Sequence, residues 1–296
     1  MTKKIAIQLF VIFAILSLFS CGSRDNYKDF KSAELSADTT NLFVTYKNMV
    51  FCVPSPQFVN LYLKHLGVYP NKSATNPVSN VEKYTTSSKK AVNLGIYGAD
   101  LGYLNIFSVS ENTNEYLSTI DQLASDLNLK LVFTREVYDH ILALKSNQDS
   151  LAHYLSIVFT RADNYLKENS QQQTSVMVIT GGWIESFYLL CYTYSQFKSN
   201  EIKNMIFQQK FILDNLIKVL APYYESSNEI QELIDGLVEI AYDFDMLDFK
   251  YKYENPIIKY QKDLMIINNE CQILNSEASL ETIIKKASIL RFKQIS

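Results

Sequence analysis

The chain has 296 residues, of which 47% are hydrophobic and 20% charged, and its net charge at pH 7 is −3. This mild acidity argues against nucleic acid and against an anionic membrane surface as partners, because both attract basic proteins. With only 8 Gly and 6 Pro, the chain has too little turn material for an all-β sandwich or barrel.

The first twenty residues have the pattern of a bacterial lipoprotein signal peptide. Lys3 and Lys4 precede an apolar run over 5–19, and Cys21 follows the small residue Ser20. The run is shorter than the roughly 20 apolar residues of a spanning helix. A cysteine placed directly after the cleavage site is the residue that receives a diacylglycerol. We expect lipidation of Cys21; ordinary cleavage that leaves Cys21 unmodified is the alternative.

The residues after the cysteine indicate where the protein resides. Gly22 stands where an inner-membrane retention signal usually has Asp, which favours the outer membrane, and no dense acidic run indicates surface display. We therefore expect a periplasmic location, with membrane attachment through the lipid on Cys21. Residues 21–40 are polar and predict a flexible tether, and residues 41–296 predict a single all-helical domain.

Apolar residues at three- and four-residue spacing predict helices along most of the first half of this domain. Ser55 and Pro56 open the first helix, and Gly67 ends it. Residues 68–88 predict a loop with one short helical turn. The next predicted helices span 88–109, begin at Asn112 or Thr113 and run to Leu127, and contain Val137, Ile141 and Leu144.

The second half continues the helical pattern. Asp149 is expected to cap a helix that runs to Leu166, and the nearly uncharged stretch 176–197 predicts a central buried helix. Further helices are expected at 201–220, at 229–247 with Ser227 as cap, from Asn255–Pro256 onward, and from Ser279 to Leu290, whereas residues 249–253 alternate and could be extended. The fold class predicted is all-α, an antiparallel bundle or helical array of about nine or ten helices.

Two of these helices resemble each other. An offset of 85 residues aligns Asp100 with Glu185 and Tyr103 with Tyr188, and two glycines precede each acid. A weak internal duplication would produce this pattern. Chance similarity between two buried helices is the alternative.

Asp100 and Glu185 are also the most informative candidates for function. No other charged residue lies within 91–110 or within 169–197. A lone carboxylate in a buried helix must be hydrogen-bonded, paired or protonated, because desolvation of an isolated charge is costly. The two acids either satisfy buried polar groups and fix packing, or face one cavity and contact a ligand.

The aromatic neighbours extend this candidate ligand-binding site to Asp100, Tyr103, Trp183, Glu185 and Tyr188. Each tyrosine lies three residues after an acid, on the same helical face, and could donate to it; Trp183 could supply its indole N–H. The leading hypothesis is a non-enzymatic binding or scaffolding role in the envelope, with a glycan, a peptide or another protein as ligand. The alternative is an envelope hydrolase that uses the two carboxylates, although no nucleophile motif or phosphate loop accompanies them.

Glycines at 95, 98 and 102 share one face of the first of these helices, and they indicate close approach of another backbone or a ligand against it. No cofactor or metal site is predicted, because the three histidines are scattered and no cysteine pair has metal-ligand spacing. Cys52, Cys191 and Cys271 are expected in apolar, helix-like surroundings as free thiols, with one disulfide as the alternative.

Two motifs, NLGIYGADL at 93–101 and GGWIE at 181–185, resemble a group of lipoproteins from Bacteroidota. The resemblance covers most of the mature chain. It implies a helical outer-membrane lipoprotein, carries no established activity, and points again to Asp100, Trp183 and Glu185.

Overall fold

The computed structural model describes residues 41–46, 49–69, 71–107, 113–259, 264–266, 270–274 and 277–296. All of them belong to one compact unit, Thr39–Ser296. The predicted signal peptide, the expected lipidation site Cys21 and the predicted tether 21–40 lie outside the described residues. The same holds for the side chains of residues 41–54 and 258–272, which include Cys52 and Cys271.

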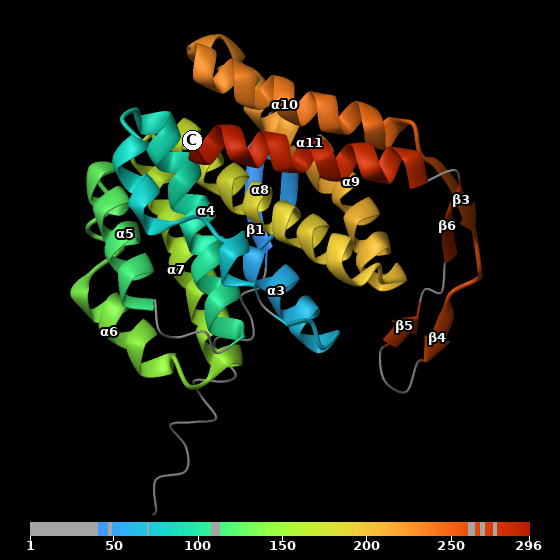
Figure 1. Cartoon of the computed structure of the whole chain (residues 1–296), viewed down its shortest axis with the longest axis horizontal. Helices are drawn as coiled ribbons and strands as arrows, with labels where there is room; N and C mark the ends of the chain where they lie inside the picture. Colours follow the sequence, from blue (N-terminus) through green and yellow to red (C-terminus); the bar gives the residue numbers. More distant parts are fainter. Residues whose placement is uncertain are drawn as a thin grey trace, which may run out of the picture. The chain divides into compact units, whose positions relative to one another are not determined.

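The described part of the chain is built mainly of α-helices, which confirms the all-α prediction (Figure 1). It contains nine: α3 (Pro56–His65), α4 (Ser87–Ile106), α5 (Thr113–Asp126), α6 (Arg135–Leu144), α7 (Gln148–Glu168), α8 (Gln172–Phe197), α9 (Asn200–Leu220), α10 (Asn228–Asp245) and α11 (Glu277–Ile295). Short 3₁₀ helices add η1 (Lys72–Ala74), η2 (Val78–Lys83) and η4 (Ala221–Ser226).

Three antiparallel two-stranded sheets correct the prediction at both ends of the domain. They pair β1 (Asn41–Tyr46) with β2 (Met49–Pro54), β3 (Asp248–Lys252) with β6 (Glu270–Leu274), and β4 (Ile257–Lys259) with β5 (Leu264–Ile266). The expected helix after Asn255–Pro256 and the helical context expected around Cys52 and Cys271 are therefore wrong, whereas the extended segment at 249–253 is confirmed. Short apolar runs rich in β-branched and aromatic residues do not show a helical or a strand period clearly enough to decide between them.

Helix starts were predicted with mixed success. Ser227 caps α10 as expected, because its side chain accepts from the Ile230 N–H. Asn147, not Asp149, caps α7, and Ser279 lies inside α11. Asp149 lies instead in the first turn of α7, where a negative charge interacts favourably with the helix dipole. Acidic residues are common both at the cap and in the first turn, so the sequence alone does not distinguish the two positions.

Helices α4 and α8 form the most extensively packed pair and lie at the centre of the unit, side by side (Figure 1). A Cβ atom on Gly95 would lie 2.0 Å from the Val178 carbonyl oxygen, and one on Gly181 would lie 1.8 Å from that of Val92. The two backbones thus approach so closely that only glycine fits at these two positions. Close backbone approach, the first of the two explanations for the glycine face, accounts for Gly95.

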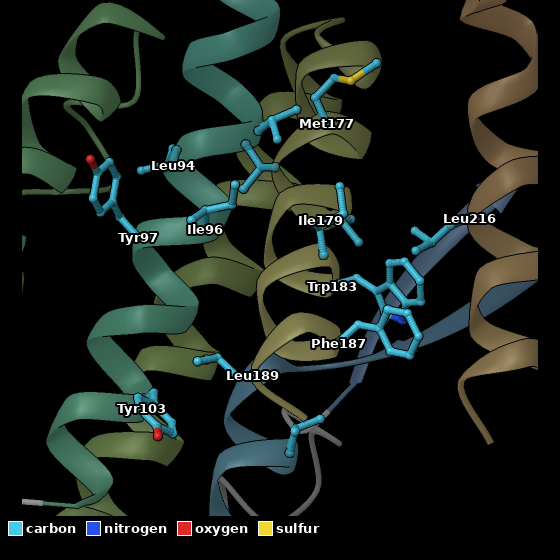
Figure 2. Packing of buried hydrophobic residues seen from close by; sticks show 14 of the residues in the cluster. Leu94, Ile96, Tyr97, Tyr103, Met177, Ile179, Trp183, Phe187, Leu189 and Leu216 are labelled. Carbon is cyan, nitrogen blue, oxygen red and sulfur yellow. The ribbon is translucent and has the colours of Figure 1, made fainter. Parts of the chain in front are cut away.

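The core extends to both sides of this helix pair (Figure 2). On α8, Trp183 and Phe187 stack with ring centroids 4.9 Å apart and point toward Leu216 of α9. On α4, Tyr97 points away from α8 and meets Tyr116 of α5 edge-on at 5.8 Å. By length and composition α8 could cross a bilayer, but 89% of its most apolar window is buried inside the protein, as befits a central core helix.

Candidate functional site

Asp100 of α4 and Glu185 of α8 meet at the helix pair, and both are fully buried. Arg291 of α11 reaches them from a third helix. Its Nε donates to Glu185 Oε2 and its Nη2 to Glu185 Oε1, each over 2.9 Å. This two-point geometry is the strongest form of arginine–carboxylate pairing. We call Asp100, Glu185 and Arg291 the buried charge cluster.

Asp100 takes part in the cluster as a neutral acid. Its Oδ2 accepts from the Asn76 backbone N–H at 2.9 Å. Oδ1 has no hydrogen-bond partner in the described part of the chain. Burial raises the pKa of Asp100 well above its usual range, and the negative charge of the neighbouring Glu185 raises it further. These effects favour a protonated Asp100 beside an ionised Glu185, with a single positive charge opposite.

Arg291 links this cluster to its surroundings. Its Nη2 also donates to the Ala74 carbonyl over 3.1 Å, and its guanidinium lies over the Tyr188 ring, 4.5 Å from the centroid. Burial disfavours the charged arginine, but the negative charge of Glu185 outweighs this effect and raises the pKa of Arg291. The guanidinium thus stays charged in a site that contains one compensating negative charge.

The structure brings some of the predicted site residues together and separates others. Asp100, Glu185 and Tyr188 gather around Arg291. Trp183 takes no part, because its indole N–H donates to Gln209 Oε1 over 3.0 Å. The hydrogen bonds expected from Tyr103 to Asp100 and from Tyr188 to Glu185 do not form within the described residues: the Tyr103 hydroxyl meets the Asn71 N–H, and the Tyr188 ring packs against the Arg291 guanidinium.

Arg291 is the cluster member that sequence reasoning missed. It lies four residues after Ala287 and one after Leu290, both buried on α11. An arginine on the apolar face of an amphipathic helix signals a buried partner. That signal was present in the sequence, although it names no partner.

The cluster also fixes the segment between α3 and α4. Arg291 holds the Ala74 carbonyl and Asp100 holds the Asn76 N–H. The Tyr116 hydroxyl donates to the Asn76 carbonyl at 2.9 Å. We call residues 71–84 the bridging segment; three helices, α4, α5 and α11, hold it in place.

Asn71, the first residue of the bridging segment, lines a cavity of about 180 Å³, which we call the tyrosine pocket. Its lining residues, all uncharged, are Tyr69, Asn71, Tyr103, Tyr192, Thr193, Gln196 and Phe197. The Asn71 backbone N–H donates to the Tyr103 hydroxyl over 3.0 Å, and its side-chain amide donates to the Tyr192 hydroxyl. One asparagine therefore ties the bridging segment to α4 and α8 at the pocket wall.

A second cavity lies among α3, α4, α7 and α8. It measures about 30 Å³ and is mostly apolar, with Asp163 and Ser175 hydrogen-bonded to each other at its edge. This volume holds little more than one water molecule. Neither Asp100 nor Glu185 is among the residues that line the two cavities.

The described residues show no metal site and no reactive thiol. Within the described residues, no three His, Cys, Asp or Glu side chains cluster in a way that could hold a metal ion. Cys191 is a buried free thiol, and burial raises its pKa, which keeps it protonated and unreactive.

The chain matches no protein-family model, and comparisons with curated proteins and with solved structures give no significant match. The function must therefore be argued from the geometry of the chain itself.

Proposed function

We propose that this chain is a lipid-anchored protein of the cell envelope that binds a small ligand, or the end of a larger one, in the tyrosine pocket. The observation that carries the proposal is the position of Asn71. This residue hydrogen-bonds the two tyrosines of the pocket wall, while Ala74 and Asn76, a few residues further, are held by the buried charge cluster. A pocket whose wall is fixed before the ligand arrives loses little entropy on binding.

In this proposal the buried carboxylates support the site and perform no chemistry. A general acid or base must come within hydrogen-bond reach of its substrate. Asp100 and Glu185 are fully buried and bonded to protein groups. The hydrolase alternative therefore has no supporting observation in the described residues, whereas Tyr103, from the same predicted set, lines the pocket.

The envelope location rests on the N-terminal sequence. Lys3, Lys4, the apolar run 5–19 and Cys21 form the lipoprotein signal, and Gly22 favours the outer membrane with the protein on its periplasmic face. The motifs at 93–101 and 181–185, which resemble lipoproteins of Bacteroidota, agree with this location. Cys21→Ser should move the protein from the membrane fraction to the soluble fraction; wild-type protein with an unmodified Cys21 in intact mass spectra would contradict the anchor.

The binding role is tested with the full-length chain and a mixed ligand panel. The panel contains neutral methyl glycosides, glucuronate, choline and dipeptides, and saturation-transfer NMR detects binding. We expect at least one class to bind, and Tyr69→Ala to reduce the signal strongly. Tyr242→Ala is the matched control, because Tyr242 is also an exposed tyrosine but lies on α10. A panel in which no signal depends on Tyr69 would refute the proposed role.

A further inference from the structure

Building on the proposed binding role, we propose that the tyrosine pocket recognises a single neutral sugar ring. The inference rests on three properties of the lining: its charge, its free hydrogen-bonding groups and its exposed aromatic rings. Each property excludes a different class of ligand.

The charge of the lining argues against anionic ligands. None of the seven lining residues carries a charged side chain, and burial raises the pKa of Tyr103, which keeps that hydroxyl protonated. The nearby ammonium of Lys198 lies over the ring of Tyr194, which does not line the pocket. Phosphate and carboxylate groups are bound by arginine and lysine, which this lining lacks. Aromatic rings can also bind an ammonium group, so the choice of a neutral ligand rests on the hydrogen-bonding groups described next, and choline serves as the competing probe.

The hydrogen-bonding groups suit a polyol. The Tyr103 and Tyr192 hydroxyls both accept from Asn71, so each retains its own proton to donate. Thr193 donates to the Leu189 carbonyl. Because Tyr103 and Thr193 are only 1% and 2% exposed, the groups within reach of a ligand belong mainly to Tyr192 and Gln196. The side chain of Gln196 is solvent-exposed and offers both a donor and an acceptor. Adjacent hydroxyl groups, each a donor and an acceptor, match this mixed set.

The aromatic rings and the size limit the ligand further. Tyr69 is 82% exposed and Phe197 is 48% exposed; both present ring surface on which the C–H face of a sugar ring can pack. A cavity of about 180 Å³ is smaller than the 300–1,000 Å³ typical of drug-sized ligands. One ring fits, and any further residues of a glycan would extend into solvent.

Isothermal titration calorimetry with the full-length chain tests the inference. The probes are the methyl glycosides of glucose, galactose, mannose and N-acetylglucosamine, with glucuronate and choline as charged controls. For one ring we expect a Kd on the order of 1 mM. Tyr69→Ala should weaken binding about tenfold by removal of the stacking surface, and Gln196→Ala by a similar factor. Both residues are exposed, so neither substitution removes part of the core, and Tyr242→Ala should leave the Kd unchanged.

The outcomes separate this inference from the proposed binding role. Binding of a neutral glycoside that both pocket substitutions weaken supports the inference. If choline, glucuronate or a dipeptide binds in a Tyr69-dependent way and no glycoside does, the sugar assignment is wrong and the binding role stands. If the binding of no ligand depends on Tyr69, both the sugar assignment and the proposed binding role are wrong.

Discussion

At the scale of single residues, the main feature is a buried acid that keeps its proton. Asp100 accepts from Asn76 through Oδ2, and burial together with the nearby Glu185 carboxylate raises its pKa. In an unfolded chain the same carboxyl has a pKa of about 3.9. Folding therefore binds a proton at neutral pH, and this coupling makes stability depend on pH.

Above about pH 4 Asp100 keeps its proton in the folded state and loses it in the unfolded state, so its contribution to the free energy of unfolding should fall as pH rises from that point. This contribution falls by about 1.4 kcal/mol per pH unit until the pH exceeds the raised pKa of Asp100. Asp100→Asn should flatten the slope and leave the protein at least as stable at pH 7, since an amide can donate and accept in the same places. Urea unfolding from pH 4 to 9 measures this.

Substitution of Glu185 should have the opposite effect on stability to substitution of Asp100. Glu185→Gln also removes a carboxylate at constant shape, but it leaves Arg291 buried without its anion. Breaking a buried pair in this way costs about 3–5 kcal/mol. Equal effects of Asp100→Asn and Glu185→Gln on the free energy of unfolding would contradict the assignment of the proton to Asp100.

At the scale of elements, glycines set the distance between α4 and α8. The backbones meet where Gly181 faces Val92 and Gly95 faces Val178. A backbone carbonyl cannot rotate away from an added methyl group, in contrast to the end of a flexible side chain. The helix pair that places Asp100 beside Glu185 therefore depends on these positions.

Gly181→Ala should destabilise the protein by about 3 kcal/mol or more, because the helices must separate. Gly236→Ala is the control: this glycine also lies inside a helix, but its added Cβ would meet Leu290 Cδ1 at 2.7 Å. That methyl group can shift, and alanine gains about 1 kcal/mol in helix propensity, so the net change should stay within about 1 kcal/mol. Similar losses in thermal unfolding for both variants would refute the close-approach argument.

At the scale of the whole unit, α11 returns from the end of the chain to the first half. Asn93 Nδ2 donates to the Gln294 carbonyl over 2.9 Å, and Lys89 Nζ donates to that of Ser296 over 3.1 Å. Together with Arg291, these bonds join α4, α8 and α11. Contacts between such distant parts of the chain make the core cooperative.

Amide hydrogen exchange should be slowest in the central helices and faster in the small sheets. Amides of α4 and α8, with most of their residues buried, should exchange only through global unfolding. Amides of β3 and β6 form a two-stranded sheet whose β3 residues are mostly exposed, and such sheets are marginally stable alone. We expect them to exchange at least about 100-fold faster. Equal protection of β3 and α4 in mass-spectrometric exchange would contradict this order.

The candidate site could be predicted from the sequence only in part. Asp100 and Glu185 stood out because each is the lone charge in a long apolar stretch, and this isolation signals burial and a partner. Their meeting across α4 and α8 matches the alignment that suggested a duplication, although the duplication itself remains a prediction. The hydrogen bond expected from Trp183 to the site was wrong, because spacing along one helix does not show which acceptors a neighbouring helix provides. Its indole N–H donates to Gln209 of α9.

The sequence alone determined the helical class, most helix positions and the burial of the two acids, because periodicity and the cost of desolvation act locally along the chain. Only the tertiary structure decided that Arg291 pairs with Glu185 and that Asn71 holds the two tyrosines of the pocket wall. It also decided that β1 pairs with β2, β3 with β6, and β4 with β5. These features depend on contacts between residues distant in sequence, which arise when helix packing brings them together.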